Sequence, residues 1–335
     1  MKKTVKMRIA FIENHLNIRG TTQSIFHYAD ANETILHNES FIITRPYHLV
    51  QHSVDAAKIV YEKFEQRFKV RYYSHVSEIP AILKEENADA CYVQKSGDPG
   101  DGLYNFGVCK TFVHAVFQPR CPHGDFYAGI SEWLNIQFGT KIPVLPYIAT
   151  LPSCNEDMRE KLGIPKDAVV FGRHGGYTAF DLVEAQNAVE RVSREHPEIY
   201  FIFLHTRPFC SPRKNIIHLD RITDPVEKVK FINTCDAMVY GRSEGETFGL
   251  AIAEFSLRNK PVLCIWDHPK MESLMHKEIL KDRAFWWKTE EELVHHMLHF
   301  DKEAVKKVDW NMYREYSAEN VMNLFQKMMQ HMLSN

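Results

Sequence analysis

The sequence lacks any long hydrophobic run. None of its apolar stretches approaches the roughly 18 residues that a membrane-spanning helix needs. The first residues, MKKTVKMRIAFIEN, combine a basic start with only a short apolar stretch before Glu13, which fits neither a secretory signal peptide nor a membrane anchor. We therefore expect a cytoplasmic protein without a transmembrane segment, and we leave peripheral membrane contact and the oligomeric state open.

An excess of charge of either sign is also missing. The 41 Lys and Arg residues and the 43 Asp and Glu residues give a net charge of -2. Such a balance produces no general field that would attract a nucleic-acid backbone. We therefore expect no nucleic-acid partner.

Paired cysteine motifs are absent as well. The seven cysteines are odd in number and scattered, with no CxxC pair, which favours free thiols in a reducing compartment. His114, Cys121 and His123 lie near one another in the sequence, but their spacing matches no metal-binding template. We therefore expect no metal site.

The apolar residues that are present suffice for two cores. Hydrophobic residues make up 44% of the 335 residues, which favours two domains of ordinary size. Short apolar runs alternate with segments of helical period, the pattern of a parallel sheet with helices on both faces. The predicted strands are 8–12, 40–44, 69–74, 88–94, 109–117, 126–131, 142–148, 169–173, 199–205, 215–219, 237–241 and 261–266.

The predicted helices fall between these strands. They are 23–36, 53–68, 76–87, 179–196, 224–235, 249–259, 290–300 and 318–333. The segment 149–168 is polar, contains two prolines and suits a linker with one short helix. The fold class is therefore α/β, with two Rossmann-like domains and a ligand site expected between them at the carboxyl ends of the strands.

The stretch EGETFGLAIAE, residues 244–254, places Glu246 and Glu254 on either side of Gly249. A predicted strand precedes it and a predicted helix begins near Gly249. The first N–H groups of such a helix lack internal partners and attract a phosphate or carboxylate, and a glycine lets the anion approach the backbone. Carboxylates beside an anion can accept hydrogen bonds from vicinal hydroxyls. The pattern therefore suits a nucleotide sugar, which has hydroxyls on both sides of a diphosphate.

EGETFGLAIAE followed by NKPVL resembles the E-x7-E signature of retaining glycosyltransferases of the GT-B fold, especially glycosyltransferase family four. The resemblance implies that Glu246 contacts hydroxyls of the transferred sugar and that Glu254 holds the ribose of the nucleotide. It also implies a diphosphate site made by the backbone of Phe248, Gly249 and Leu250, with Thr247 beside them.

Other segments resemble the same family in the same order. MREKLGIPKDAVVFGR ends in Arg173, which the resemblance places at the phosphates, and IIHLDRITDPVEKVKFINTCDAMVY contains Arg221, expected near the nucleobase. TFVHAVF contains His114, expected near the transferred sugar, and NIRGTTQS takes the place of a glycine-rich loop with Gly20 at its turn.

The resemblance implies a division of the chain. It gives an N-terminal acceptor-binding domain, 1–150, and a nucleotide-sugar-binding domain, 151–310. A C-terminal helix in 311–335 would cross back and pack on the N-terminal domain, which would bury the apolar stripe of that helix.

The sequence departs from the family pattern after Arg173. The family has a lysine five or six residues further on that also contacts the phosphates, whereas GRHGGYTAFD contains none. Gly175 and Gly176 precede Thr178 and Asp181, which have the spacing of a capping box, so we expect a second helix N-terminus to face the diphosphate.

Ordinary structural roles stay open for several of these residues. Arg173 is also compatible with a surface ion pair, His114 with a hydrogen-bonded core histidine, and Arg221 with a solvated surface arginine. Glu244, just ahead of the motif, is interpreted as a solvated carboxylate.

We predict a glycosyltransferase, a hexosyl- or pentosyltransferase, that moves a sugar from a UDP- or GDP-sugar to a hydroxyl of a glycan or another acceptor. Fixed donors aimed at the leaving diphosphate would supply most of the catalysis, without a metal or a bound cofactor. Retention of configuration is implied by the resemblance alone. Two alternatives stay open: a sugar-nucleotide epimerase of the same fold, and a non-catalytic protein that binds sugar nucleotides or glycans, which the missing lysine favours.

Overall fold

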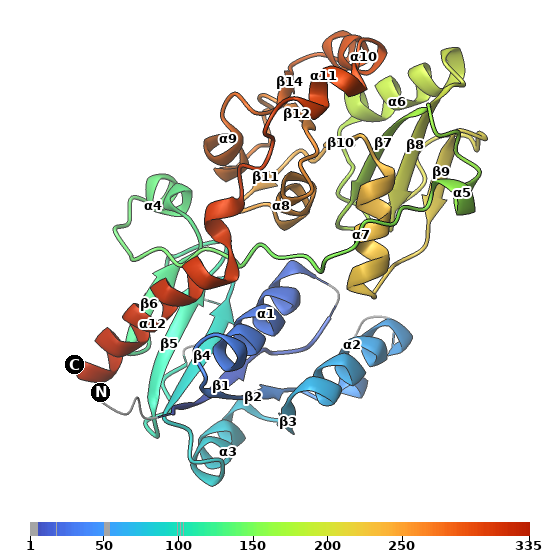
Figure 1. Cartoon of the computed structure of the whole chain (residues 1–335). Helices are drawn as coiled ribbons and strands as arrows, with labels where there is room; N and C mark the ends of the chain where they lie inside the picture. The colour runs from blue at the N-terminus through green and yellow to red at the C-terminus, as the bar shows by residue number, and fades with distance from the viewer. Residues whose placement is uncertain (1–5, 18, 50–53, 99, 101, 103) are drawn as a thin grey trace. The chain divides into compact units, whose positions relative to one another are not determined.

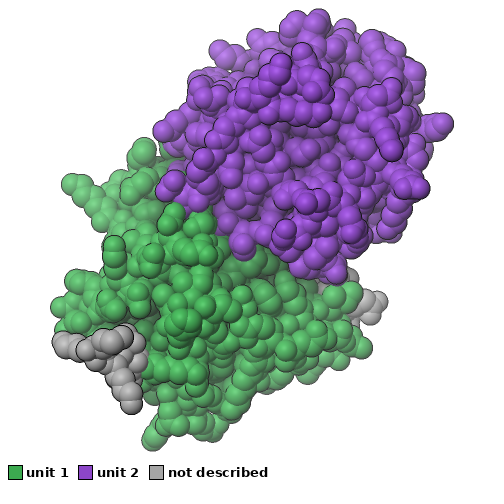
Figure 2. Space-filling model, viewed as in Figure 1, with its two compact units in different colours: residues 1–148, 316–335 green, residues 149–315 purple. Residues whose placement is uncertain are grey.

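The chain forms two compact units (Figures 1 and 2). In the computed structural model the described residues are 6–17, 19–49, 54–98, 100, 102 and 104–335. Unit 1 comprises Met1–Ile148 with Tyr316–Asn335, and unit 2 comprises Ala149–Glu315. Each unit contains its own six-stranded parallel sheet.

The sheet of unit 1 has the strand order β3-β2-β1-β4-β5-β6. Because β1 pairs with β2 on one side and with β4 on the other, the strand order reverses beside β1, as it does in doubly wound folds. The strands are β1 (Arg8–Ile12), β2 (Glu39–Thr44), β3 (Lys69–Tyr72), β4 (Ala90–Lys95), β5 (Lys110–Ala115) and β6 (Phe126–Gly129).

Helices cover this sheet (Figure 1). They are α1 (Gly20–Thr34), α2 (Val54–Arg67), α3 (Ile79–Glu85), α4 (Glu132–Phe138) and α12 (Ala318–Ser334), with short 3-10 turns at Tyr47–Leu49 and Val76–Glu78. A further 3-10 turn, Arg314–Tyr316, lies where the chain passes from unit 2 to unit 1. Strands β1, β2, β4 and β5 are almost completely buried, as expected for a parallel sheet packed on both faces.

Helix α12 packs on unit 1, although it follows unit 2 in the sequence. Ser317 caps its first turn by accepting a hydrogen bond from the Asn320 N–H. The buried Phe325 stacks on Phe112 of β5 at a centroid distance of 5.8 Å. The predicted return of the C-terminal helix to the N-terminal domain is therefore confirmed.

The sheet of unit 2 has the order β14-β12-β10-β7-β8-β9. Its strands are β7 (Val169–His174), β8 (Ile199–Leu204), β9 (Ile216–Leu219), β10 (Ala237–Val239), β12 (Val262–Ile265) and β14 (Phe285–Trp287), and a separate pair consists of β11 (Gly245–Glu246) and β13 (Ser273–Leu274). Strand β7 lies between β10 and β8, so the order of this sheet reverses beside β7.

Some helices of unit 2 begin at side chains that cap them. The helices of this unit are α5 (Arg159–Leu162), α6 (Val183–Glu195), α7 (Pro225–Thr234), α8 (Leu250–Leu257), α9 (Met275–Leu280), α10 (Glu290–Leu298) and α11 (Lys302–Lys306). At α7, for example, Asp224 accepts hydrogen bonds from the Val226 and Glu227 N–H groups, and Pro225 occupies the first turn. At α10, Thr289 accepts one from Glu292.

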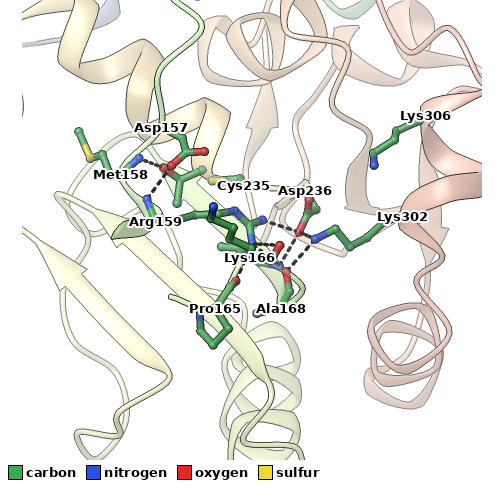
Figure 3. A network of polar contacts seen from close by, with 12 residues as sticks. Asp157, Met158, Arg159, Pro165, Lys166, Ala168, Cys235, Asp236, Lys302 and Lys306 are labelled. Atoms are coloured by element: carbon green, nitrogen blue, oxygen red, sulfur yellow. Dashed lines mark hydrogen bonds and ion pairs between the residues drawn. The ribbon is translucent and has the colours of Figure 1, made fainter. Parts of the chain in front are cut away.

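The predicted linker 149–168 is fastened to the sheet of unit 2 by a polar network (Figure 3). Arg159 donates to Asp236 at 2.9 Å and to the carbonyl oxygen of Ala168 at 2.9 Å. Asp236 also accepts from the Val170 N–H at 2.9 Å and pairs with Lys302 at 3.5 Å. One carboxylate thus joins α5, the start of β7 and α11.

One predicted strand is wrong. Residues 142–148 form only an isolated bridge between Val144 and Gly129. Pro143 and Pro146 lack the N–H groups that a ladder requires. Conversely, the edge strand β14 and the short pair of β11 and β13 carried no signal long enough to predict them.

Candidate functional site

The Glu246 to Glu254 stretch forms the predicted strand-to-helix turn. It leads from β10 through β11 to α8, and Gly249 immediately precedes the helix with φ 86°. A Cβ at position 249 would lie 3.3 Å from the Cβ of Glu246 and 3.3 Å from the hydroxyl oxygen of Tyr313. The left-handed backbone and these neighbours together favour glycine.

Phe248, the residue before Gly249, is held by buried contacts with Tyr313. The Tyr313 hydroxyl donates to the carbonyl of Phe248 at 2.8 Å, and the two rings pack edge to face. Gly249, the residue at the N-cap position of α8, has no side chain that could cap the first turn. The first N–H groups of this helix therefore keep their capacity to bind an anion.

Glu246 lies beside this turn with its side chain 20% exposed. The Tyr240 hydroxyl donates to its carboxylate at 3.3 Å, and Arg242 approaches both carboxylate oxygens at 3.4 Å. Burial raises the pKa of Glu246, while Arg242 and the Tyr240 hydroxyl oppose the rise. Glu244 is 68% exposed and pairs with Arg242 at 2.8 Å, in keeping with its interpretation as a solvated carboxylate.

Arg173 is buried at the end of β7, with 4% of its surface exposed, so the alternative of a surface ion pair is wrong. Its guanidinium donates to the Thr206 hydroxyl at 2.6 Å and to the carbonyl of Gly176 at 3.2 Å. Burial lowers the pKa of Arg173 to about 10, and the charge of Glu246 opposes this effect. Within the described part of the chain, no carboxylate lies at ion-pair distance from it.

Gly175 and Gly176 contact the guanidinium of Arg173 and do not lie at the start of a helix. Gly175 has φ 145°, and a Cβ there would lie 3.2 Å from a guanidinium nitrogen of Arg173. The predicted capping box is wrong, because α6 begins only at Val183 and Leu182 provides no side-chain cap. Asp181 instead accepts hydrogen bonds from the N–H and hydroxyl of Ser243, at 2.9 and 2.5 Å.

Glu254 lies one turn into α8 and is 6% exposed. Lys228 of α7 pairs with one of its carboxylate oxygens, and Nε2 of His174, at the end of β7, lies 3.1 Å from the other. Burial alone would raise the pKa of Glu254, but Lys228 and His174 outweigh it and lower the pKa to about 2. The carboxylate is therefore ionised and fixed in place.

Sequence analysis missed His174 and Lys228. His174 follows Arg173 directly at the end of the same strand, where side chains reach the carboxyl edge of the sheet. Lys228 lies in the first turns of α7, where the helix dipole disfavours a cation. The unfavourable position of the Lys228 charge was the signal in the sequence that could have indicated a buried partner for this lysine.

Arg221 follows β9, and its guanidinium lies 3.3 Å from Nε2 of His205; its place near the nucleobase stays a prediction. Gly20 is the first residue of α1 in unit 1 and so begins a helix instead of lying within a loop. Its role in the donor site stays a prediction as well.

His114 belongs to the core of unit 1. It is fully buried on β5, and Nδ1 lies 2.6 Å from the Tyr92 hydroxyl oxygen. Burial lowers the pKa of His114 to about 3, so the ring is neutral at physiological pH. This geometry is that of a hydrogen-bonded core histidine, and a catalytic role for His114 stays a prediction.

In the described ranges, no three His, Cys, Asp or Glu side chains gather closely enough to hold a metal ion. None of the helices that the structure describes combines the length and the apolar character that crossing a membrane requires.

No protein-family model matches the sequence, and no curated protein matches it either. Solved structures do match over nearly the whole chain. A glycosyltransferase from Rickettsia africae ESF-5 has a TM-score of 0.67 at 14% identity, with 99% of this chain and 100% of that chain covered.

Two further solved structures carry ligands. Anabaena HepE (Alr3699) in complex with UDP-glucose has a TM-score of 0.68 at 14% identity, covering 98% of this chain and 100% of that one. The pneumococcal O-GlcNAc transferase GtfA, with UDP and GlcNAc, has a TM-score of 0.64 at 10% identity, covering 99% and 100%. At these identities the similarity concerns the fold. With its two parallel six-stranded sheets and returning C-terminal helix, the chain has the GT-B fold.

Proposed function

We propose that the protein is a glycosyltransferase that uses a nucleotide-diphosphate sugar. The observation that carries the proposal is the state of Arg173: a buried guanidinium without a carboxylate at ion-pair distance in the described chain. A buried cation without a counterion is costly unless an anion completes its site. In the same unit, the uncapped N-terminus of α8 supplies backbone donors for such an anion.

The proposed chemistry uses these groups directly. As the bond between the anomeric carbon and the phosphate oxygen breaks, the leaving diphosphate gains negative charge. Arg173 and the backbone of Phe248, Gly249 and Leu250, with Thr247 beside them, would stabilise that charge with donors fixed in advance. Thr206 and the carbonyl of Gly176 hold the guanidinium in place.

The two glutamates of the motif would position the donor. Glu246, partly exposed beside Gly249, would accept hydrogen bonds from the transferred sugar. Glu254, ionised and fixed by Lys228 and His174, would accept them from the ribose. The carboxylate retains lone pairs beyond those that its present partners use.

Known complexes favour one donor type. HepE is known with UDP-glucose, and GtfA with UDP and GlcNAc, so we propose a UDP-sugar ahead of a GDP-sugar. We further propose retention of configuration and metal independence, on the resemblance of the E-x7-E stretch. Unit 1 would bind the glycan or other hydroxyl acceptor.

A turnover assay tests the proposal. The protein is incubated with a panel of UDP-, GDP- and ADP-sugars, and nucleotide release is measured with and without glycan acceptors. We expect release from one donor, and we expect Glu246→Ala to reduce it strongly. Tight donor binding without release would indicate a binding protein instead. A new sugar nucleotide without free nucleotide would indicate an epimerase, and unchanged turnover by Glu246→Ala would refute the proposed site.

A further inference from the structure

Unit 2 has a concave site that shares no residue with the group around Arg173. It is open to solvent and has a volume of about 620 Å³, within the usual range of small-molecule sites. Trp266, which follows β12, and Trp286, in β14, supply its aromatic walls, and the first turns of α10 supply its polar side. None of these residues takes part in the proposed transferase chemistry.

The two tryptophans form a rigid corner. Their ring centroids lie 5.4 Å apart and their planes meet at 86°. The indole N–H of Trp286 donates to the carbonyl of Lys281 at 2.6 Å, and the backbone N–H of Trp266 donates to Trp287 at 2.7 Å. Lys277 covers the Trp266 ring at 4.1 Å. Trp266 nevertheless remains 41% exposed, an unusual state for the largest apolar side chain.

Two carboxylates border this corner. One oxygen of Glu291 accepts from Arg191 and one oxygen of Glu292 accepts from the Lys288 N–H, each at 2.6 Å. These bonds fix the carboxylates without exhausting their lone pairs. His296 is fixed as well, since its Nε2 lies 2.9 Å from the carbonyl oxygen of Trp286. The pocket therefore combines an apolar corner with oriented hydrogen-bond acceptors.

The charges at this pocket balance and suit a neutral ligand. Glu291, Glu292 and Lys288 line it, and the ammonium group of Lys277 lies over the Trp266 ring, so neither an anion nor a cation meets charge of one sign. A purely apolar ligand would pack on the indoles but would make no hydrogen bond to the free lone pairs of the two carboxylates. A pyranose ring satisfies both halves of the site, because its C–H face packs on an aromatic ring while its hydroxyls donate to carboxylates.

We propose that this tryptophan pocket binds one pyranose unit of a neutral saccharide. The ring would pack in the corner between Trp266 and Trp286, and its hydroxyls would donate to Glu291 and Glu292. Such a site would hold a glycan to unit 2 independently of the nucleotide-binding residues.

Fluorotryptophan labelling of the full chain tests this site. The chain has five tryptophans, so fluorine NMR gives few signals, and single Trp→Phe variants assign them. The probes are methyl β-glucopyranoside, cellotriose and triacetylchitotriose. We expect at least one of them to shift the signals of Trp266 and Trp286 saturably, while those of Trp133, Trp287 and Trp310 stay in place.

Variants make the test specific. Trp266→Ala should weaken the binding seen at Trp286 about fivefold or more, the factor expected for one lost aromatic contact. The matched control is Ile136→Ala, which removes an exposed apolar side chain, 68% exposed, on α4 of unit 1, and it should leave binding unchanged. The signals of the buried Trp287 and Trp310 report whether each variant keeps its fold.

If Trp266→Ala does not fold, Glu291→Gln replaces it, because that side chain is 72% exposed and tolerates the change. It should also weaken saccharide binding. The inference is overturned if none of the three probes gives a saturable shift, or if the variants bind as well as the unsubstituted protein. It is equally overturned if a proline-rich peptide shifts the two signals and the saccharides do not.

Discussion

Nε2 of His174 lies 3.1 Å from Oε2 of Glu254, while Lys228 pairs with the other carboxylate oxygen. The three side chains come from β7, α8 and α7, which only the fold brings together. Because both partners are basic, they keep a buried carboxylate ionised where burial alone would favour its neutral form. An ionised acceptor in a fixed position is what a pair of ribose hydroxyls requires.

The first prediction concerns the pH dependence of folding. The pKa of Glu254 is about 2 in the fold and 4.5 as its ordinary value. Its ionised form therefore stabilises the protein above about pH 4.5, and this contribution disappears as the pH falls toward 2. A shift of this size corresponds to about 3 kcal/mol. Urea unfolding should show Glu254→Gln strongly destabilised at pH 6, with the difference from the unsubstituted protein shrinking by pH 3.

Glu319→Gln is the control for this measurement, since it changes an exposed glutamate at the start of α12. It should follow the unsubstituted protein at every pH. A Glu254→Gln deficit of equal size at pH 6 and pH 3 would contradict the ionised state assigned to Glu254.

The second prediction concerns Arg173 and the diphosphate. Arg173→Gln should lower kcat by about 10²–10³-fold, the usual effect of removing one donor that stabilises transition-state charge. It should also weaken binding of UDP, measured by calorimetry, while binding of uridine stays nearly the same. Arg194→Gln is the matched control, because Arg194 lies on α6 with its side chain 54% exposed. Equal losses for UDP and uridine would argue against a phosphate role.

The third prediction separates backbone strain from crowding at Gly249. Gly249→Ala and Gly139→Ala both put an alanine at positive φ, 86° and 62°, which costs about 1–2 kcal/mol. Apart from the adjacent residues of the chain, no described atom lies within 4 Å of a Cβ at position 139, whereas Glu246 and Tyr313 lie 3.3 Å from one at position 249. Gly249→Ala should therefore unfold at lower urea concentration than Gly139→Ala, and it alone should weaken nucleotide binding. If the two variants unfold at the same urea concentration and bind nucleotide equally well, then Glu246 and Tyr313 move to accommodate a Cβ at position 249, and crowding there costs little.

The sequence predicted those parts of the structure that have local causes. Helix α7 begins where Asp224 and Pro225 indicate, because the cap and the proline act within one turn. The turn at Gly249 was likewise predictable, since a strand period, a glycine and a helix period follow one another. The helical spacing of its apolar residues also predicted the helix at 318–333, whereas the return of this helix, α12, to unit 1 was predictable only through the family resemblance.

Contacts between distant residues account for what the sequence did not predict. Thr178 and Asp181 have the spacing of a capping box, but the carboxylate of Asp181 accepts two hydrogen bonds from Ser243, which lies 62 positions away. Asp181 therefore does not cap a helix, and α6 begins only at Val183. The partners of Glu254 are likewise 26 and 80 positions away in the chain, so no motif around Glu254 could reveal them.

The fourth prediction concerns the attachment of α12 to unit 1. Phe325 is fully buried and contacts the rings of Phe11, Tyr28, Tyr92 and Phe112. Phe325→Ala should destabilise the protein by about 3–5 kcal/mol, because it removes the contacts and leaves a cavity. Leu333→Ala, on the same helix but 37% exposed, should cost much less. Urea unfolding followed by circular dichroism measures both, and equal losses would contradict the packing of this helix.

The last prediction concerns the network of Figure 3. The Asp236 side chain is 14% exposed, and its carboxylate accepts from Arg159 and from the Val170 N–H. Asp236→Ala leaves both donors without their partner, so we expect it to destabilise the protein by about 2–4 kcal/mol.

Two further variants separate charge from hydrogen bonding in this network. Asp236→Asn keeps an oxygen for the Val170 N–H but loses the charge, and it should fall between the alanine variant and the unsubstituted protein. Asp309→Ala breaks the exposed pair between Asp309 and Arg314, whose side chains are 59% and 53% exposed, and should destabilise the protein much less than Asp236→Ala, because solvent screens an exposed ion pair. If urea unfolding gives Asp236→Ala a loss no larger than that of Asp309→Ala, then α5 and α11 do not depend on this carboxylate for their attachment to β7.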